Sequence, residues 1–245
     1  MRKSTIIVGA QREGKTYYAE SVLTEYAKKG GVAVAYNVGR PSDFSRFISV
    51  SLITPDVAYT MAKKAGKKIR MDDIPFEIGF FSVNERIYKI QDFCRLFRGK
   101  CVKIERLNPN KKEENLLFEA IYKYFYNAII VMDDFRSVTR HGLSKEFIQL
   151  SSRQNHTGFK LGIPAEMCGI DMFIVYHAFS TVSVETYDYI NSIVQFRTAS
   201  PPDLKGNNDE LQEVLTRNYS ELRDMPKYSR IEVDTISYLT KKIEK

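Results

Sequence analysis

The 245-residue sequence lacks any apolar run that approaches the roughly 20 residues a membrane-spanning helix needs. Its longest apolar stretch, residues 172–184, is interrupted by His177, Ser180 and Thr181. The first ten residues combine a basic start with an apolar stretch, but that stretch is too short for a signal peptide and leads into Gln11. We therefore expect an intracellular protein without stable membrane insertion.

Cysteine and histidine are scarce, with three residues of each in the chain. Cys94, Cys101 and Cys168 are odd in number, and no two of them have the spacing of a chelating pair. The histidines are scattered in the same way. These residues predict reduced thiols and give no indication of a zinc site.

Acidic residues are outnumbered, and the net charge of +7 is concentrated in one part of the chain. Residues 61–112 contain fourteen Lys and Arg against six Asp and Glu, so the remainder is close to neutral. A local basic surface favours a polyanionic partner, because neutralising phosphates releases counterions. The alternative is a solvated basic face that keeps the protein soluble.

Hydrophobic residues make up 43% of the chain, which is enough to bury a core. Short β-branched runs predict buried strands, and apolar residues at helical spacing predict helices between them. The clearest strands are residues 4–8, 32–36, 128–132 and 171–176, and the clearest helices are 15–29, 113–126, 143–153 and 209–223. More ambiguous segments are a partly helical stretch at 43–68 and short strands at 76–83, 101–107, 193–196 and 231–233, the last at a sheet edge.

This alternation predicts an α/β fold with a mostly parallel central β-sheet flanked by helices. We expect one domain over residues 1–245, with a basic insertion around 55–112 and a helical C-terminal extension over 203–245.

The segment between the first strand and the first helix matches G-x-x-x-x-G-K-[ST], the P-loop or Walker A motif. Glycines let such a loop fold tightly, so that backbone N–H groups surround phosphate oxygens at the positive end of the following helix. The lysine reaches the β- and γ-phosphates and the hydroxyl binds Mg²⁺. The motif predicts an ATP and Mg²⁺ site at Gly9, Ala10, Gln11, Arg12, Glu13, Gly14, Lys15 and Thr16.

Polar residues follow two later strands. Asp133 comes directly after four apolar residues, as a Walker B aspartate does, and is expected to hold Mg²⁺ together with Thr16. Asp134 is then placed to orient or deprotonate the attacking water, although most ATPases of this type carry Glu there. His177 ends the strand at 171–176, where a polar residue can sense the γ-phosphate. The structural alternatives are a solvated strand end or helix cap for the aspartates and a hydrogen-bonded histidine.

Ring-shaped ATPases commonly use an arginine finger to stabilise charge in the transition state. Arg153 is our first candidate and Arg197 our second, because both are expected near the catalytic edge of the sheet. Arg136 and Arg140 are further candidates.

With these residues in place, the chain resembles the FtsK–HerA superfamily of RecA-like P-loop ATPases, and in particular the genome-packaging ATPases of tailless, membrane-containing icosahedral viruses and the Zot-like phage ATPases. The resemblance covers residues 1–200 and rests on the early P-loop, the mid-chain Asp133 and the polar end of the strand at His177. Two further stretches match, Ser-Arg-Gln-Asn-His-Thr-Gly at 152–158 and Val-Gln-Phe-Arg at 194–197. The sequence departs from the pattern in Asp134, in the split Arg-His pair and in about a dozen extra residues at 159–169.

The resemblance implies a pentameric or hexameric homo-oligomeric ring that threads double-stranded DNA into a preformed capsid, with capsid or portal-vertex proteins as partners. It also implies a place in the host cytoplasm or on the virion. Two alternatives stay open: an assembly or secretion ATPase that moves protein, and a P-loop small-molecule kinase. A GTPase would need an N-K-x-D motif, and the sequence contains none.

Overall fold

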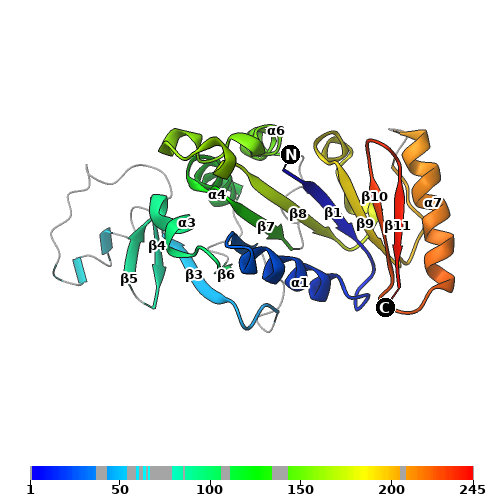
Figure 1. Cartoon of the computed structure of the whole chain (residues 1–245), viewed down its shortest axis with the longest axis horizontal. Coiled ribbons are helices and arrows are strands. Elements are labelled where there is room, and N and C mark those ends of the chain that lie inside the picture. The colour runs from blue at the N-terminus through cyan, green and yellow to red at the C-terminus, as the bar shows by residue number, and fades with distance from the viewer. Residues whose placement is uncertain are drawn as a thin grey trace.

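The computed structural model describes residues 2–36, 43–53, 59–60, 63–64, 66, 79–84, 86–105, 111–133, 143–204 and 208–244. Within them, eleven strands form one sheet in the order β11-β10-β9-β1-β8-β7-β2-β6-β3-β4-β5 (Figure 1). The strands are β1 (Ser4–Val8), β2 (Val32–Tyr36), β3 (Ile48–Ile53), β4 (Phe80–Val83), β5 (Arg86–Lys89), β6 (Cys101–Glu105), β7 (Ala128–Met132), β8 (Ile170–Tyr176), β9 (Ser192–Phe196), β10 (Arg230–Asp234) and β11 (Thr240–Ile243).

The helices are α1 (Lys15–Lys28), α3 (Phe93–Leu96), α4 (Lys111–Tyr124), α6 (Lys145–Ser152) and α7 (Asp209–Asp224). Short 3-10 turns are η2 (Ile90–Asp92), η3 (Gln154–His156), η4 (Phe159–Leu161), η5 (Ala165–Met167), η6 (Phe179–Thr181) and η7 (Val184–Tyr189).

The strands from β9 to β3 in the sheet order are parallel to one another. At the two ends of the sheet, β10 and β11 and then β4 and β5 are added in antiparallel pairs. Parallel strands need helices on both faces, which explains why β1, β2 and β7 are buried at every position. The predicted α/β fold with a mostly parallel sheet is confirmed.

Alternate residues of the parallel strands contribute to two separate hydrophobic cores. Ile7 of β1 packs on the face covered by α1, together with Leu23 of that helix. Ile6 and Val8 point to the other face, which α4, α6 and α7 cover (Figure 1). This alternation follows from the two-residue period of a strand, and it fixes the pairing register because a one-residue slip would exchange the two faces.

Two ambiguous segments are corrected by the structure. Residues 48–53, expected to be part of a helical stretch, form β3, since a short apolar run does not distinguish a strand from a helix. The strand at 231–233 is not at the edge, because β11 pairs with its outer side. The C-terminal segment is therefore helix α7 followed by a β-hairpin, and in the region 55–112 strand β6 lies inside the sheet between β2 and β3.

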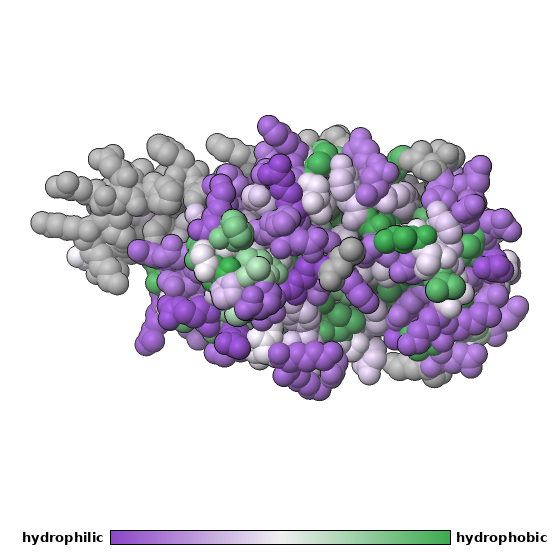
Figure 2. Space-filling view, turned by 45° about the horizontal axis from the view of Figure 1, so that its top comes forward, coloured by the Kyte–Doolittle hydropathy of each residue, from purple (hydrophilic) through white to green (hydrophobic). Residues whose placement is uncertain are grey.

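The face turned toward the viewer in Figure 2 is mainly hydrophilic, with hydrophobic residues in small, separate groups. None of the helices in the described part of the chain combines the length and hydropathy that crossing a bilayer requires.

Candidate nucleotide-binding site

The loop between β1 and α1 needs glycine at both of its motif positions. A Cβ on Gly9 would lie 2.6 Å from the Cβ of Phe196 in β9, which is too close for two carbon atoms that are not bonded to each other. Gly14 has φ of 93°, a left-handed conformation that other residues adopt only with strain. The two glycines thus let the loop lie tightly against the end of β9, where the backbone N–H of Ala10 donates to the carbonyl of Arg197 at 2.8 Å.

At the amino terminus of α1, the N-cap residue, Gly14, supplies no hydrogen-bond-accepting side chain, and no residue of the first turn is negatively charged. The first N–H groups of a helix have no partner within the helix, and the helix dipole places positive charge there. This end of α1 can therefore accept phosphate oxygens as partners for its first N–H groups.

The side chain of Lys15 folds back into the loop. Its ammonium donates to the carbonyl of Gly9 at 2.6 Å and to the carbonyl of Ala10 at 2.7 Å, and the residue is only 6% exposed. Burial lowers the pKa of Lys15 to about 8, while the carboxylates of Asp133 and Glu13 act in the opposite direction. The loop thus holds a cation whose charge a polyphosphate would stabilise.

The lowered pKa predicts that nucleotide affinity depends on pH. Above about pH 8 the free protein loses the Lys15 proton, which a bound polyphosphate would restore. Binding then takes up one proton, so the affinity for ATP should fall by about tenfold per pH unit above this value. Titrations between pH 7 and 9.5 measure the effect. An affinity that stays constant up to pH 9.5 would contradict it.

Strand order brings two further polar residues to the same edge. Strand β8 lies between β1 and β7, so residues that follow these three parallel strands lie next to one another. Val8 pairs with Tyr176, and Met132 pairs with Ile174, which places His177 and Asp133 beside the loop. Asp133 is fixed further by its backbone N–H, which donates to the carbonyl of Tyr36 at 2.9 Å.

These groups line a single cavity of about 490 Å³. From the motif it receives Gln11, Arg12, Gly14, Lys15 and Thr16, and from the strand ends Asp133 and His177. His177 is exposed and Asp133 is half-buried. The structure thus brings the phosphate-binding loop, a carboxylate and an imidazole together around a space of suitable size for a polyphosphate.

No family model and no curated protein matches the sequence. Among solved structures, the chain is similar to the genome packaging NTPase B204 of Sulfolobus turreted icosahedral virus 2 in complex with ATP-gammaS, with a TM-score of 0.61 and 13% identity over 99% of this chain and 97% of that chain. It is also similar to B204, the DNA-packaging ATPase of Sulfolobus turreted icosahedral virus (TM-score 0.57, 14% identity, 99% and 97% covered). For VirB4 of Thermoanaerobacter pseudethanolicus the TM-score is 0.51, with 8% identity over 98% of this chain and 88% of that chain.

The chain has the fold of P-loop ATPases. The likeness spans nearly the whole chain, and it agrees with the sequence resemblance to viral packaging ATPases at the level of the fold.

Within this P-loop fold, the residues at the cavity suit a bound Mg²⁺. Mg²⁺ in nucleotide sites takes one or two protein ligands and completes its shell with phosphates and water. Thr16 and Asp133 both line the cavity, together with Lys15. No group of three or more His, Cys, Asp or Glu that could hold a metal alone occurs in the described ranges. The two oxygen donors, Thr16 and Asp133, match the one or two protein ligands that Mg²⁺ takes in nucleotide sites.

Asp134, Arg136 and Arg140 lie outside the described residues, so the structure does not place them. Arg153 is exposed at the end of α6. The two residues that follow it, Gln154 and Asn155, are hydrogen-bonded to Arg2, just before the start of β1. Gln154 donates to the carbonyl of Arg2, whose N–H donates to Asn155 Oδ1.

Arg153 therefore lies at the amino-terminal edge of the sheet, opposite the P-loop, and its expected place near the catalytic edge is wrong. The physical reason is that α6 has to return the chain to the start of the parallel strand β8. Within one copy Arg153 is remote from the cavity, and its role as a finger in a neighbouring copy stays a prediction.

Arg197, the second candidate, is at the catalytic edge but is engaged elsewhere. Its guanidinium donates to the carbonyl of Leu222 at 3.1 Å and to that of Met225 at 2.6 Å. These carbonyls belong to the end of α7, where a helix leaves acceptors without partners. Arg197 thus ties α7 to the end of β9.

Sequence reasoning missed several residues at the cavity. Tyr17 follows the motif directly, while Asp43, Lys227 and Tyr228 come from distant segments. Asp43 is brought there in part by Glu20 of α1, whose carboxylate accepts the backbone N–H of Phe44 at 3.0 Å. No local pattern marks Asp43, Lys227 and Tyr228, because only the fold brings them to the P-loop. The adjacency of Tyr17 to the motif, in contrast, was a signal that could have found it.

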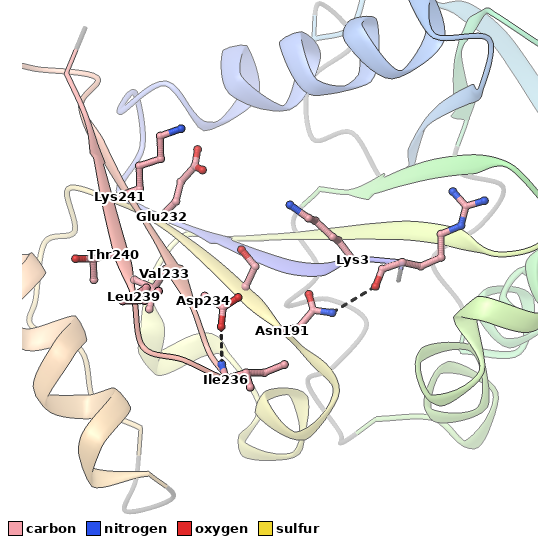
Figure 3. A pocket seen from close by; sticks show the side chains of 11 residues that line it. Lys3, Asn191, Glu232, Val233, Asp234, Ile236, Leu239, Thr240 and Lys241 are labelled. Carbon is pink, nitrogen blue, oxygen red and sulfur yellow. Dashed lines mark hydrogen bonds between the residues drawn. The ribbon is translucent and has the colours of Figure 1, made fainter. Parts of the chain in front are cut away.

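A second cavity, of about 360 Å³, lies near the amino-terminal ends of β1 and β9, away from the P-loop (Figure 3). It is formed by the beginning of β1, by Asn191 and by the β10–β11 hairpin, and none of the motif residues lines it. The carboxylate of Asp234 there accepts backbone N–H groups of Ile236 and Ser237 and so closes the hairpin turn. We therefore assign no ligand to this cavity.

Proposed function

We propose that this protein is an ATPase that uses ATP hydrolysis to move double-stranded DNA, and that it packages a viral genome into a preformed capsid. The ATPase part rests on one observation. Lys15, which is buried, lines the same cavity at the amino terminus of α1 as Asp133 and His177. A phosphate cradle alone would bind nucleotide, whereas polar groups beside the γ-phosphate position are what hydrolysis requires.

In this proposal, Lys15 leaves the carbonyls of Gly9 and Ala10 and binds the β- and γ-phosphates, where it stabilises negative charge in the transition state. Thr16 and Asp133 hold Mg²⁺, which when bound neutralises part of the phosphate charge. Asp134 orients or deprotonates the attacking water, and His177 helps to place it. These residues belong to the P-loop or follow β7 or β8 in the chain.

The DNA part of the proposal is supported by the likeness to B204 along nearly the entire chain and by the basic excess in residues 61–112. Moving DNA of any sequence requires a grip on the backbone without base readout, which Lys and Arg provide. We further propose a homo-oligomeric ring of five or six copies that docks on capsid or portal-vertex proteins, in the host cytoplasm or on the virion.

Neutralising the basic run at Lys63, Lys64, Lys67 and Lys68 together should weaken DNA binding for all sequences alike. Lys63 and Lys64 are exposed, and the other two lie outside the described residues. Each lost phosphate contact should reduce the slope of log affinity against log salt by about 0.9. Basal ATP hydrolysis should persist, since the P-loop is untouched. DNA affinity measured over a range of salt concentrations gives the slope.

A matched control removes the same charge from exposed lysines elsewhere, Lys28, Lys29, Lys160 and Lys241. An unchanged slope in the first variant would show that the 61–70 segment is only a solvated face. ATP hydrolysis that double-stranded DNA does not stimulate would favour the alternatives, an ATPase that moves protein or a small-molecule kinase.

A further inference from the structure

The two sides of the P-loop differ in chemistry. On one side of β1 lie β8 and β7, which supply His177 and Asp133 to the cavity. On the other side lie β9, β10 and β11, and the turn that leads into β10 supplies Lys227 and Tyr228. If the γ-phosphate lies next to Asp133 and His177, the α-phosphate and the nucleoside must leave the P-loop toward β9 and β10.

A third cavity, of about 460 Å³, lies on that side. It shares Gly14, Tyr17 and Tyr228 with the P-loop cavity, so the two spaces adjoin at these residues. Its wall is mostly aromatic and aliphatic, and it includes Tyr17, Tyr18, Phe196, Tyr228 and Ile243. An apolar, aromatic-lined space next to a phosphate cradle has the properties of a site for a nucleoside base.

We infer that the third cavity binds the purine base of a nucleoside triphosphate, with Tyr17 and Tyr228 as the residues that stack on the base. The inference rests on the proposed function, and it assigns the binding site of the base, which the proposed function does not specify. Tyr17 is 63% exposed and Tyr228 is 41% exposed, so both rings are accessible to a ligand. Both stand at the junction of the two cavities, where a base connected to P-loop phosphates would lie.

The position of Tyr228 is set by a strained backbone. Its φ of 72° is in the left-handed region, which costs free energy for a bulky residue, so the surrounding contacts have to hold it there. This conformation places the ring against Gly14, where a Cβ would lie 3.2 Å from Tyr228 Cδ1. A side chain larger than hydrogen at position 14 would therefore push the ring away from the P-loop.

Two cationic side chains near the cavity, Arg230 and Lys227, already have partners. The Arg230 guanidinium donates to Glu232 at 3.1 Å and lies 4.5 Å from the centre of the Tyr18 ring. The Lys227 ammonium is 5.1 Å from the centre of the Tyr228 ring, an exposed contact that a stacked base can replace. We expect stacking on Tyr17 and Tyr228 to be the main source of affinity for the base.

The test compares the affinities for MgATP and for inorganic triphosphate with Mg²⁺, measured by calorimetry on the full chain. The wild-type protein should bind MgATP more tightly. Tyr17→Ala and Tyr228→Ala should each weaken MgATP binding by about tenfold, the effect of losing one aromatic stack, and leave the affinity for triphosphate unchanged. Tyr17→Phe and Tyr228→Phe keep the ring and should bind MgATP as the wild type does. Phe159→Ala removes an aromatic residue that is 67% exposed and far along the chain, and serves as the control.

The outcomes separate the inference from the proposed function. A wild-type protein that prefers MgATP, with both alanine variants unaffected, would overturn the base site and leave the phosphate site intact. Equal wild-type affinities for MgATP and triphosphate would also overturn it. Binding of neither ligand would contradict the proposed function itself.

Discussion

Lys15→Ala is expected to reduce ATP hydrolysis to background, a loss of at least about 10³-fold. The ammonium is buried in the P-loop, where it donates to two carbonyls, and in the proposed function it moves from them to the phosphates. Without this ammonium, no cation from the loop stabilises the negative charge that develops on the transferring phosphoryl group. Phosphate release at saturating MgATP measures the loss.

A matched control is Lys29→Ala, which removes an exposed lysine just beyond the other end of α1. It should hydrolyse ATP at the wild-type rate. Because Lys15 also satisfies carbonyls inside the loop, circular dichroism and thermal unfolding should accompany the assay, so that loss of fold is not taken for loss of catalysis. A well-folded Lys15→Ala protein with near wild-type turnover would show that the P-loop is not the catalytic site.

Asp134→Asn is expected to slow hydrolysis by about 10²- to 10⁴-fold while ATP binding stays largely intact. Asparagine has nearly the same shape as aspartate but cannot accept a proton from water. His177→Ala should have the same signature with a smaller loss, because the imidazole only helps to place the water. Single-turnover hydrolysis and equilibrium binding of ATP, measured side by side, separate the two effects.

Asp133→Ala provides the contrast, since it should weaken Mg²⁺-dependent nucleotide binding as well as turnover. If Asp134→Asn and His177→Ala lost binding in step with turnover, both residues would have structural roles. The assignment of the water-activating group would then have to move to another residue, with Asp43 at the cavity as the first choice.

The parts of the fold that the sequence predicted well are those set by local chemistry. The strands at 4–8, 32–36 and 128–132 have the predicted bounds, because β-branched and alanine runs buried on both faces leave little choice of structure. Helix α1 ends one residue before its expected end, ahead of Gly30 at φ 85°. The P-loop residues could be located because their glycines, lysine and threonine are close together in the chain.

The parts that could not be predicted depend on contacts between distant segments. Strands β5 and β11 are short and polar, and they exist because a neighbouring strand pairs with them. The place of Arg153 depends on the direction in which α6 crosses the sheet. Tyr228 and Lys227 reach the P-loop only because the hairpin of β10 and β11 folds back beside β9.

The rate of ATP hydrolysis by the purified full chain, measured over a titration with double-stranded DNA, tests the proposed function most directly. The wild-type protein should release phosphate from MgATP, and DNA of unrelated sequences should stimulate the rate to a similar extent. Lys15→Ala should show no turnover at any DNA concentration. A wild-type protein that does not hydrolyse ATP, or one whose rate no double-stranded DNA stimulates, would contradict the proposal.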